Sequence, residues 1–218
     1  MNKKTNQKLQ DIYKRLYECY GPQHWWPAEE PFEVMVGAIL TQSAAWANVE
    51  KAIINLKMAG MLKPAALRAI SAEELAVLIH ACGYFNMKTR KLKALADWLG
   101  EQFSDRLEKM RCIDTDSLRG SLLEVHGVGE ETADSILLYA CDKPVFVIDA
   151  YTRRIVDRLG LRIKGTKYSD YQSYFVNNLP LDTRLFNEYH ALLVALGKNH
   201  CCKVPVCKGC CLRETCKK

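Results

Sequence analysis

The chain has 218 residues, of which 49% are hydrophobic and 26% are charged, and its formal net charge is +6. This composition is that of a folded globular protein and excludes a disordered chain, while the length allows one large domain or two small ones. No apolar run is long enough to cross a membrane and the polar start of the chain is not a secretion signal, so we expect a cytoplasmic protein whose ten cysteines are thiols rather than disulfides.

Apolar residues recur at helical spacing almost throughout the chain, and no segment shows the alternation of a strand. Ser71 and Glu74 form the sequence pattern of a capping box, which marks the start of one helix. We therefore predict an all-α protein with helices over residues 8–20, 31–42, 48–60, 71–83, 88–103, 114–127, 130–141, 145–160 after an extended start, 169–179 and 183–200.

Gly127, Val128 and Gly129 form a turn between two of these helices. Such a turn leaves backbone N–H groups at the N-terminus of the second helix, where they and the helix dipole favour a phosphate. A plain turn between two packed helices has the same pattern, so the motif by itself leaves both interpretations open.

Asp149 follows an apolar run and precedes a helix that carries Arg153 and Arg154. An aspartate in this position commonly caps the helix that follows it. The alternative is a partly buried carboxylate that faces a positive charge developing in a reaction.

Six of the ten cysteines lie in the last eighteen residues. Cys207, Cys210 and Cys216, with Cys201 or Cys202 before them, have the spacing of four thiolate ligands. The pattern predicts a metal site and leaves both zinc and an iron–sulfur cluster open. A tail of free thiols is the alternative.

Three of the four tryptophans lie in two short segments, Trp25 and Trp26 before Pro27, and Trp46. Indole rings from two segments could hold a flat, electron-poor ring between them, although tryptophans more often pack in a core.

Two further segments combine polar or aromatic residues with a helix end. Gln42 ends an apolar helix, where its amide needs a hydrogen-bond partner. Tyr84 and Phe85 follow Gly83 in a turn, and basic residues come next. A bulky side chain on such a turn could wedge into a stack of bases, and an ordinary helix–helix corner is the alternative.

In this order, these segments resemble the endonuclease III family of helix-hairpin-helix DNA glycosylases, and the resemblance covers nearly the whole chain. The Trp-Trp-Pro segment and the Leu-Thr-Gln segment before Trp46 are most similar to the 3-methyladenine DNA glycosylase branch. The resemblance implies a two-domain endonuclease III-like fold. A six-helix barrel with the hairpin would span 30–143, and residues 1–29 and 144–218 would form a helical domain that carries an iron–sulfur loop.

The resemblance also implies an enzyme of base excision repair, which hydrolyses the N-glycosidic bond of a flipped damaged base in double-stranded DNA. A cationic alkylated purine such as 3-methyladenine suits a pocket of indole rings. The implied site residues are Asp149 for catalysis; Trp25, Trp26, Pro27 and Trp46 for the base pocket; Gln42, Tyr84 and Phe85 for intercalation into DNA; and Gly127, Val128 and Gly129 for a backbone phosphate.

Glu131 departs from the pattern of the bifunctional family members, which carry a lysine two residues after the second hairpin glycine. A carboxylate cannot form the Schiff base that leads to strand cleavage. We therefore expect a monofunctional glycosylase without AP lyase activity.

The cysteine loop is also slightly different from that of the family. The resemblance implies a [4Fe-4S] cluster, in preference to zinc, on Cys201, Cys207, Cys210 and Cys216. The family usually has six residues between its first two cysteines, whereas five separate Cys201 from Cys207, so Cys202 and His200 remain alternatives for the first ligand.

Other activities remain open at this stage. The enzyme could excise a mismatched thymine or uracil, or an oxidised base. It could cleave the strand through another amine, such as Lys88 or Lys143, or it could be a DNA-binding module without chemistry. The expected partner is duplex DNA with a damaged base, and we expect no membrane association. We expect the protein to be a monomer in the cytoplasm, associated with the nucleoid if the cell is prokaryotic.

Overall fold

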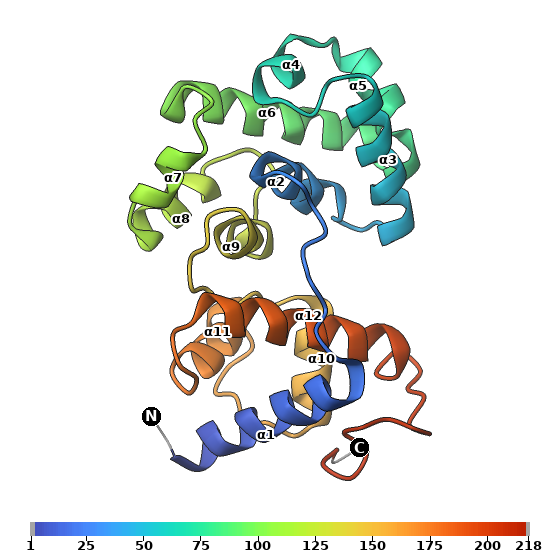
Figure 1. Ribbon diagram of the computed structural model, residues 1–218, viewed down its shortest axis with the longest axis vertical. Coiled ribbons are helices and arrows are strands. Elements are labelled where there is room, and N and C mark those ends of the chain that lie inside the picture. Colours follow the sequence, from blue (N-terminus) through green and yellow to red (C-terminus); the bar gives the residue numbers. More distant parts are fainter. Residues whose placement is uncertain (1–2, 217–218) are drawn as a thin grey trace. The chain divides into compact units, whose positions relative to one another are not determined.

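The computed structural model describes residues 3–216, and these form helices and connecting segments without a strand (Figure 1). The predicted all-α class is therefore confirmed, and none of the described helices is long and apolar enough to span a bilayer. The helices are α1 (Lys3–Tyr20), α2 (Pro31–Leu40), α3 (Trp46–Met58), α4 (Pro64–Ala69), α5 (Ala72–Leu78), the 3-10 helix η1 (His80–Cys82), α6 (Phe85–Phe103), α7 (Glu108–Cys112), α8 (Thr115–Leu123), α9 (Glu130–Tyr139), α10 (Ala150–Arg158), α11 (Tyr168–Val176) and α12 (Thr183–Asn199).

The chain divides into two compact units. One unit runs from Ala28 to Lys143 and contains α2 to α9. The other combines the described residues up to Pro27 with those from Pro144 onward, and it contains α1 and α10 to α12.

Helix α2 forms the core of the Ala28–Lys143 unit. Pro31 opens the helix, where its missing N–H costs no hydrogen bond, and every residue from Phe32 to Leu40 is buried. The helix packs against α3, α6 and α9, while α6 also packs against α4 and α5 (Figure 1). Helices α8 and α9 pack on each other and form a hairpin. Because α9 also packs on α2, this hairpin is attached to the central helix.

Helix α12 packs against both α1 and α10 in the other unit. An aromatic cluster fills the core of this unit: Phe146 stacks on Phe175 with ring centroids 4.0 Å apart, and Phe186 and Tyr189 meet Phe146 edge-on. The extended segment that contains Phe146 leads directly into α10, so this core holds the start of that helix in place.

The structure differs from the sequence-based elements in short segments. Helices α4 and α7 were not expected, because each is too short to show helical periodicity. The helix predicted over 71–83 ends at Leu78 and continues as η1, and the helix predicted over 114–127 ends at Leu123. The capping box is confirmed, since Ser71 Oγ accepts from Glu74 N–H at 3.1 Å and Ser71 N–H donates to the Glu74 carboxylate at 3.2 Å.

Candidate functional site

The turn between α8 and α9 depends on a glycine for two reasons. Gly127 has a φ of +84°, which favours glycine, and a Cβ atom there would lie only 2.3 Å from Lys91 Cγ. Gly129 is extended and precedes α9, so the free N–H groups at the start of α9 begin at this turn. Val128 between them is buried and anchors the turn in the unit.

Gln42 holds this turn to the end of α2. Its amide Nε2 donates to Gly127 O at 3.1 Å and to Thr132 Oγ1 at 2.9 Å, and its Oε1 accepts from Lys91 Nζ at 2.6 Å. The amide predicted to need a partner therefore has three, and Lys91 is a part of this junction that the sequence did not identify. Lys91 stands in a basic stretch, which gave no sign of a specific contact.

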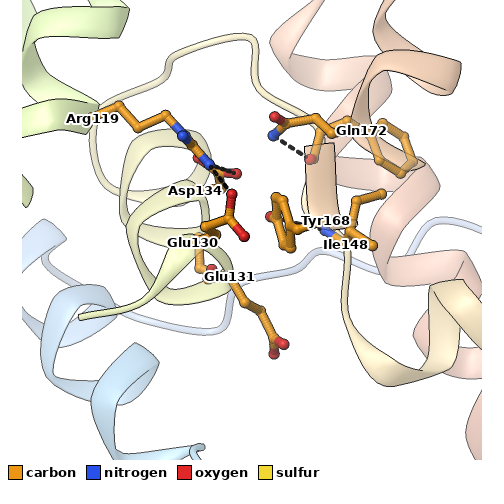
Figure 2. Close-up of polar contacts among 9 residues, drawn as sticks. Arg119, Glu130, Glu131, Asp134, Ile148, Tyr168 and Gln172 are labelled. Atoms are coloured by element: carbon orange, nitrogen blue, oxygen red, sulfur yellow. Dashed lines mark hydrogen bonds and ion pairs between the residues drawn. The ribbon is translucent and has the colours of Figure 1, made fainter. Parts of the chain in front are cut away.

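The hairpin carboxylates have different surroundings. Asp134 is fully buried and accepts from Arg119 Nε of α8 at 2.7 Å, while Glu130 lies 3.6 Å from the same guanidinium (Figure 2). This arginine therefore connects the two helices of the hairpin. Glu131 is exposed, and its carboxylate points away from Arg119 (Figure 2).

The turn before α6 presents one aromatic ring to solvent. Tyr84 has a φ of +46° and is 73% exposed, which is unusual for a large side chain in a left-handed conformation. Phe85 instead packs on His80, with ring centroids 4.5 Å apart. Of the two aromatic residues predicted to enter DNA, Tyr84 is the one that projects.

Lys88 forms hydrogen bonds just before the turn that carries Tyr84. Its side chain is buried, and its ammonium donates to Leu40 O at 2.8 Å and to Cys82 O at 2.9 Å. Burial lowers its pKa. The lysine therefore satisfies the carbonyl ends of two helices.

Asp149 caps α10 as one of its two predicted roles requires. Its Oδ1 accepts from Thr152 N–H at 2.6 Å. Two residues of α11 hold the backbone that leads to Asp149. The Tyr168 hydroxyl accepts from Ile148 N–H at 3.1 Å, and Gln172 donates to Phe146 O at 2.9 Å (Figure 2).

The second carboxylate oxygen of Asp149 faces a histidine. Asp149 Oδ2 lies 3.7 Å from His190 Nε2 of α12, and the two side chains are only 12% and 8% exposed. Burial acts to raise the pKa of the Asp149 carboxyl, but His190 and Thr152 together lower it below its ordinary value. Asp149 is therefore held in the charged form. His190 was missed from the sequence, where it stands in an apolar helix like any core residue.

Cys201, Cys207, Cys210 and Cys216 line a single cavity of about 310 Å³. Burial raises the pKa of Cys210, and the thiols of Cys207, Cys201 and Cys216 raise it further. In the described part of the chain, no three metal-binding side chains converge on one ion position. Four thiols on one cavity are a donor set that suits either zinc or an iron–sulfur cluster.

The alternatives for the first ligand differ in their surroundings. The Cys202 thiol donates to Lys198 O at 3.1 Å. His200 lines the cavity, but its Nδ1 is 3.0 Å from Val206 O. Cys201 is among the residues that line the cavity, together with the other three proposed ligands.

Two arginines of α10 hold the cysteine loop. Arg154 Nε donates to Cys201 O at 2.7 Å. Arg158 donates to Cys202 O at 2.7 Å, to Lys203 O at 2.9 Å and to the Cys201 sulfur at 3.2 Å. The helix that Asp149 caps therefore also carries the contacts that order this loop.

The tryptophans predicted to hold a base are partly exposed in their own units. Trp25 and Trp26 lie with ring centroids 5.0 Å apart, Pro27 beside them is exposed, and Lys198 Nζ lies 5.7 Å from the Trp25 ring. Trp46 is the first residue of α3. All three tryptophans are half-buried.

Comparison with known proteins identifies relatives over the whole chain. The family model of the HhH-GPD superfamily of base excision DNA repair proteins matches residues 36–179. A candidate DNA repair glycosylase of Methanocaldococcus jannaschii is 43% identical over 218 residues, with 99% of each protein covered.

Solved structures share the fold. The H. pylori 3-methyladenine DNA glycosylase bound to 1,N6-ethenoadenine has a TM-score of 0.77 and 26% identity over 89% of this chain and 97% of that one. An endonuclease III trapped as a covalent intermediate on DNA has a TM-score of 0.82 and 21% identity over 97% and 95%. Since the family model covers more than half of the chain and one relative is similar from end to end, this protein is a helix-hairpin-helix DNA glycosylase of the endonuclease III family and belongs to the HhH-GPD superfamily of base excision DNA repair proteins.

Proposed function

We propose that this glycosylase is a monofunctional enzyme that removes an alkylated purine, such as 3-methyladenine, from double-stranded DNA and leaves an abasic site. The observation that carries the proposal is Glu131, a carboxylate where bifunctional relatives have the Schiff-base lysine. The likeness to a 3-methyladenine DNA glycosylase, at 26% identity, supports the choice of base. The enzyme acts as a monomer.

The alternative amines for a lyase reaction are already engaged. Lys88 Nζ donates to two backbone carbonyls and is buried. Lys143 Nζ donates to Arg111 O at 2.8 Å and to Ile113 O at 2.6 Å. A nucleophilic amine must be free to attack the sugar, so these contacts argue against both lysines as the Schiff-base residue.

Asp149 drives base departure in the proposed mechanism. As the base leaves, the sugar gains oxocarbenium character, and a carboxylate already held in the charged form stabilises that positive charge without reorganising. The same carboxylate can orient the attacking water. A cationic alkylated purine is a good leaving group, so strong protonation of the base is not required.

The base and the DNA are proposed to meet different parts of the chain. Trp25, Trp26, Pro27 and Trp46 are the proposed base contacts, and the backbone N–H groups at Gly127 to Gly129 are proposed to bind a phosphate. The exposed Tyr84 is proposed to fill the gap in the stack, together with Gln42 and Phe85.

A [4Fe-4S] cluster on Cys201, Cys207, Cys210 and Cys216 is proposed to complete the unit. Their common cavity supports this ligand set. When bound, the cluster supplies a covalent crosslink of the C-terminal loop rather than a reacting group.

The choice of base is tested with duplexes that each carry one lesion. We expect release of 3-methyladenine from methylated duplex DNA and no release of uracil or thymine opposite guanine. A duplex with 1,N6-ethenoadenine, the base in the similar H. pylori structure, belongs in the panel because it is neutral and so separates recognition of a flat ring from recognition of a positive charge. Release of uracil or thymine without release of a methylated purine would refute the substrate proposal.

Asp149→Asn should abolish base release while DNA binding survives. Asparagine caps a helix about as well as aspartate, so the start of α10 should be retained while the negative charge is lost. We expect the single-turnover rate of 3-methyladenine release to fall by at least about 100-fold. A gel-shift titration with the same duplex provides the control for binding, and a normal rate would show that Asp149 is not the catalytic carboxylate.

Borohydride trapping on DNA with an abasic site tests the monofunctional mechanism. The wild type should form no covalent protein–DNA adduct. Glu131→Lys should form one, because the exposed position after the hairpin would then carry an amine. An endonuclease III that forms such adducts is the positive control, and an adduct with the wild type would overturn the proposal.

Cys201→Ser and Cys202→Ser form a matched pair for the cluster. The first variant should lose the absorption near 400 nm that thiolate-bound iron–sulfur clusters show, whereas the second should keep it. Iron and acid-labile sulfide content give the same comparison without a spectrum. Zinc in place of iron in the wild-type protein, or equal losses in both variants, would contradict the ligand set.

A further inference from the structure

His190 is a buried, titratable side chain to which the mechanism above gives no role. It lies on α12, which packs against α10 in the same compact unit. Its side chain is 8% exposed, and its Nε2 lies 3.7 Å from Asp149 Oδ2. A histidine buried against the catalytic acid can do more than fill the core.

We propose that His190 is a positioning residue for base excision, which fixes the Asp149 carboxylate in one orientation and keeps it charged. The inference rests on the proposed catalytic role of Asp149. It adds a second residue that affects the rate of base excision by acting on Asp149.

The geometry divides the work between the two carboxylate oxygens. Oδ1 of Asp149 is held by the Thr152 N–H at 2.6 Å, which fixes one oxygen but allows the carboxylate plane to turn. The imidazole of His190 lies 3.7 Å from the other oxygen, within ion-pair distance, and an attraction there favours one orientation of that plane. Orientation matters because a small displacement of a catalytic group can lower the rate about 100-fold.

Neighbouring charges on α10 are directed elsewhere. Arg153 donates to Thr166 O at 3.0 Å, and Arg154 donates to Cys201 O at 2.7 Å. Neither guanidinium is therefore the partner of Asp149, although both follow it on the same helix.

The other titratable groups near His190 on α12 also have other partners. Tyr189 donates its hydroxyl to a backbone carbonyl of α1, Glu188 accepts from a backbone N–H in the segment after α1, and Lys198 lies over a tryptophan ring. Among the described residues of these two packed helices, His190 is thus the titratable side chain that acts on Asp149.

The arrangement determines the sign of a pH effect. Burial alone would raise the pKa of the Asp149 carboxyl, and His190 is the main cause of its being lowered instead. The wild-type acid therefore stays ionised down to low pH. Without His190, burial dominates, the acid takes up a proton at a higher pH, and activity should fail earlier on the acid side.

The test compares three variants by single-turnover release of 3-methyladenine from methylated duplex DNA between roughly pH 5 and pH 9, with enzyme-free depurination subtracted. His190→Leu should be at least about tenfold slower at neutral pH, and its acid limb should move to higher pH. His190→Gln keeps a hydrogen-bond donor but cannot be protonated, so it should recover most of the rate at alkaline pH but keep the displaced acid limb.

Tyr189→Phe is the matched control, because it removes a buried hydrogen bond from the same helix without touching Asp149. It should keep the wild-type rate and pH profile, even if its melting temperature falls. Wild-type rate and profile in both His190 variants, or the same displacement in Tyr189→Phe, would overturn the inference.

The outcomes also separate this inference from the proposed function. If Asp149→Asn retains full activity, the catalytic assignment fails whatever His190 does. If Asp149→Asn is inactive and both His190 variants behave as the wild type, only the role of His190 fails. Thermal melting identifies a variant that does not fold, and His190→Gln, which is closer in shape, decides the question if His190→Leu is such a variant.

Discussion

A carboxylate removed from water must be given partners if it is to remain charged, and this requirement organises the unit that contains Asp149. The N–H of Thr152 meets one oxygen at the start of α10, and His190 from α12 meets the other. Tyr168 and Gln172 hold the strand-like approach to the cap by hydrogen bonds to its backbone. Side chains of α11 and α12 thus act on Asp149 or on the segment that leads to it.

Features that depend on neighbouring residues were predictable. The all-α class followed from helical periodicity, and the capping box at Ser71 followed from two residues three apart. The cap at Asp149 and the turn at Gly127 likewise need only local chain geometry. Cysteine spacing identified four thiols that line one cavity, because metal ligation depends on the separation of ligands along a loop.

Features that arise when distant segments pack together were not predictable. His190 has no local signal, since it becomes a partner of Asp149 only when α12 lies against α10. Lys91 looked like one of several surface charges, whereas its stem crosses Gly127 and its ammonium binds Gln42. In both cases the sequence shows the residue type but not the neighbour that gives it a role.

The ammonium of Lys88 bonds to Leu40 O and Cys82 O, and each carbonyl stands shortly before a segment proposed to enter DNA, at Gln42 and at Tyr84. Both segments thus follow backbone that is held by one cation inside the protein, and holding a contact segment in place before binding lowers the entropy cost of binding. We expect the double helix, not the enzyme, to deform when they meet. A lesion that weakens base stacking makes the DNA easier to deform. Such a lesion would then favour binding before the damaged base enters the pocket.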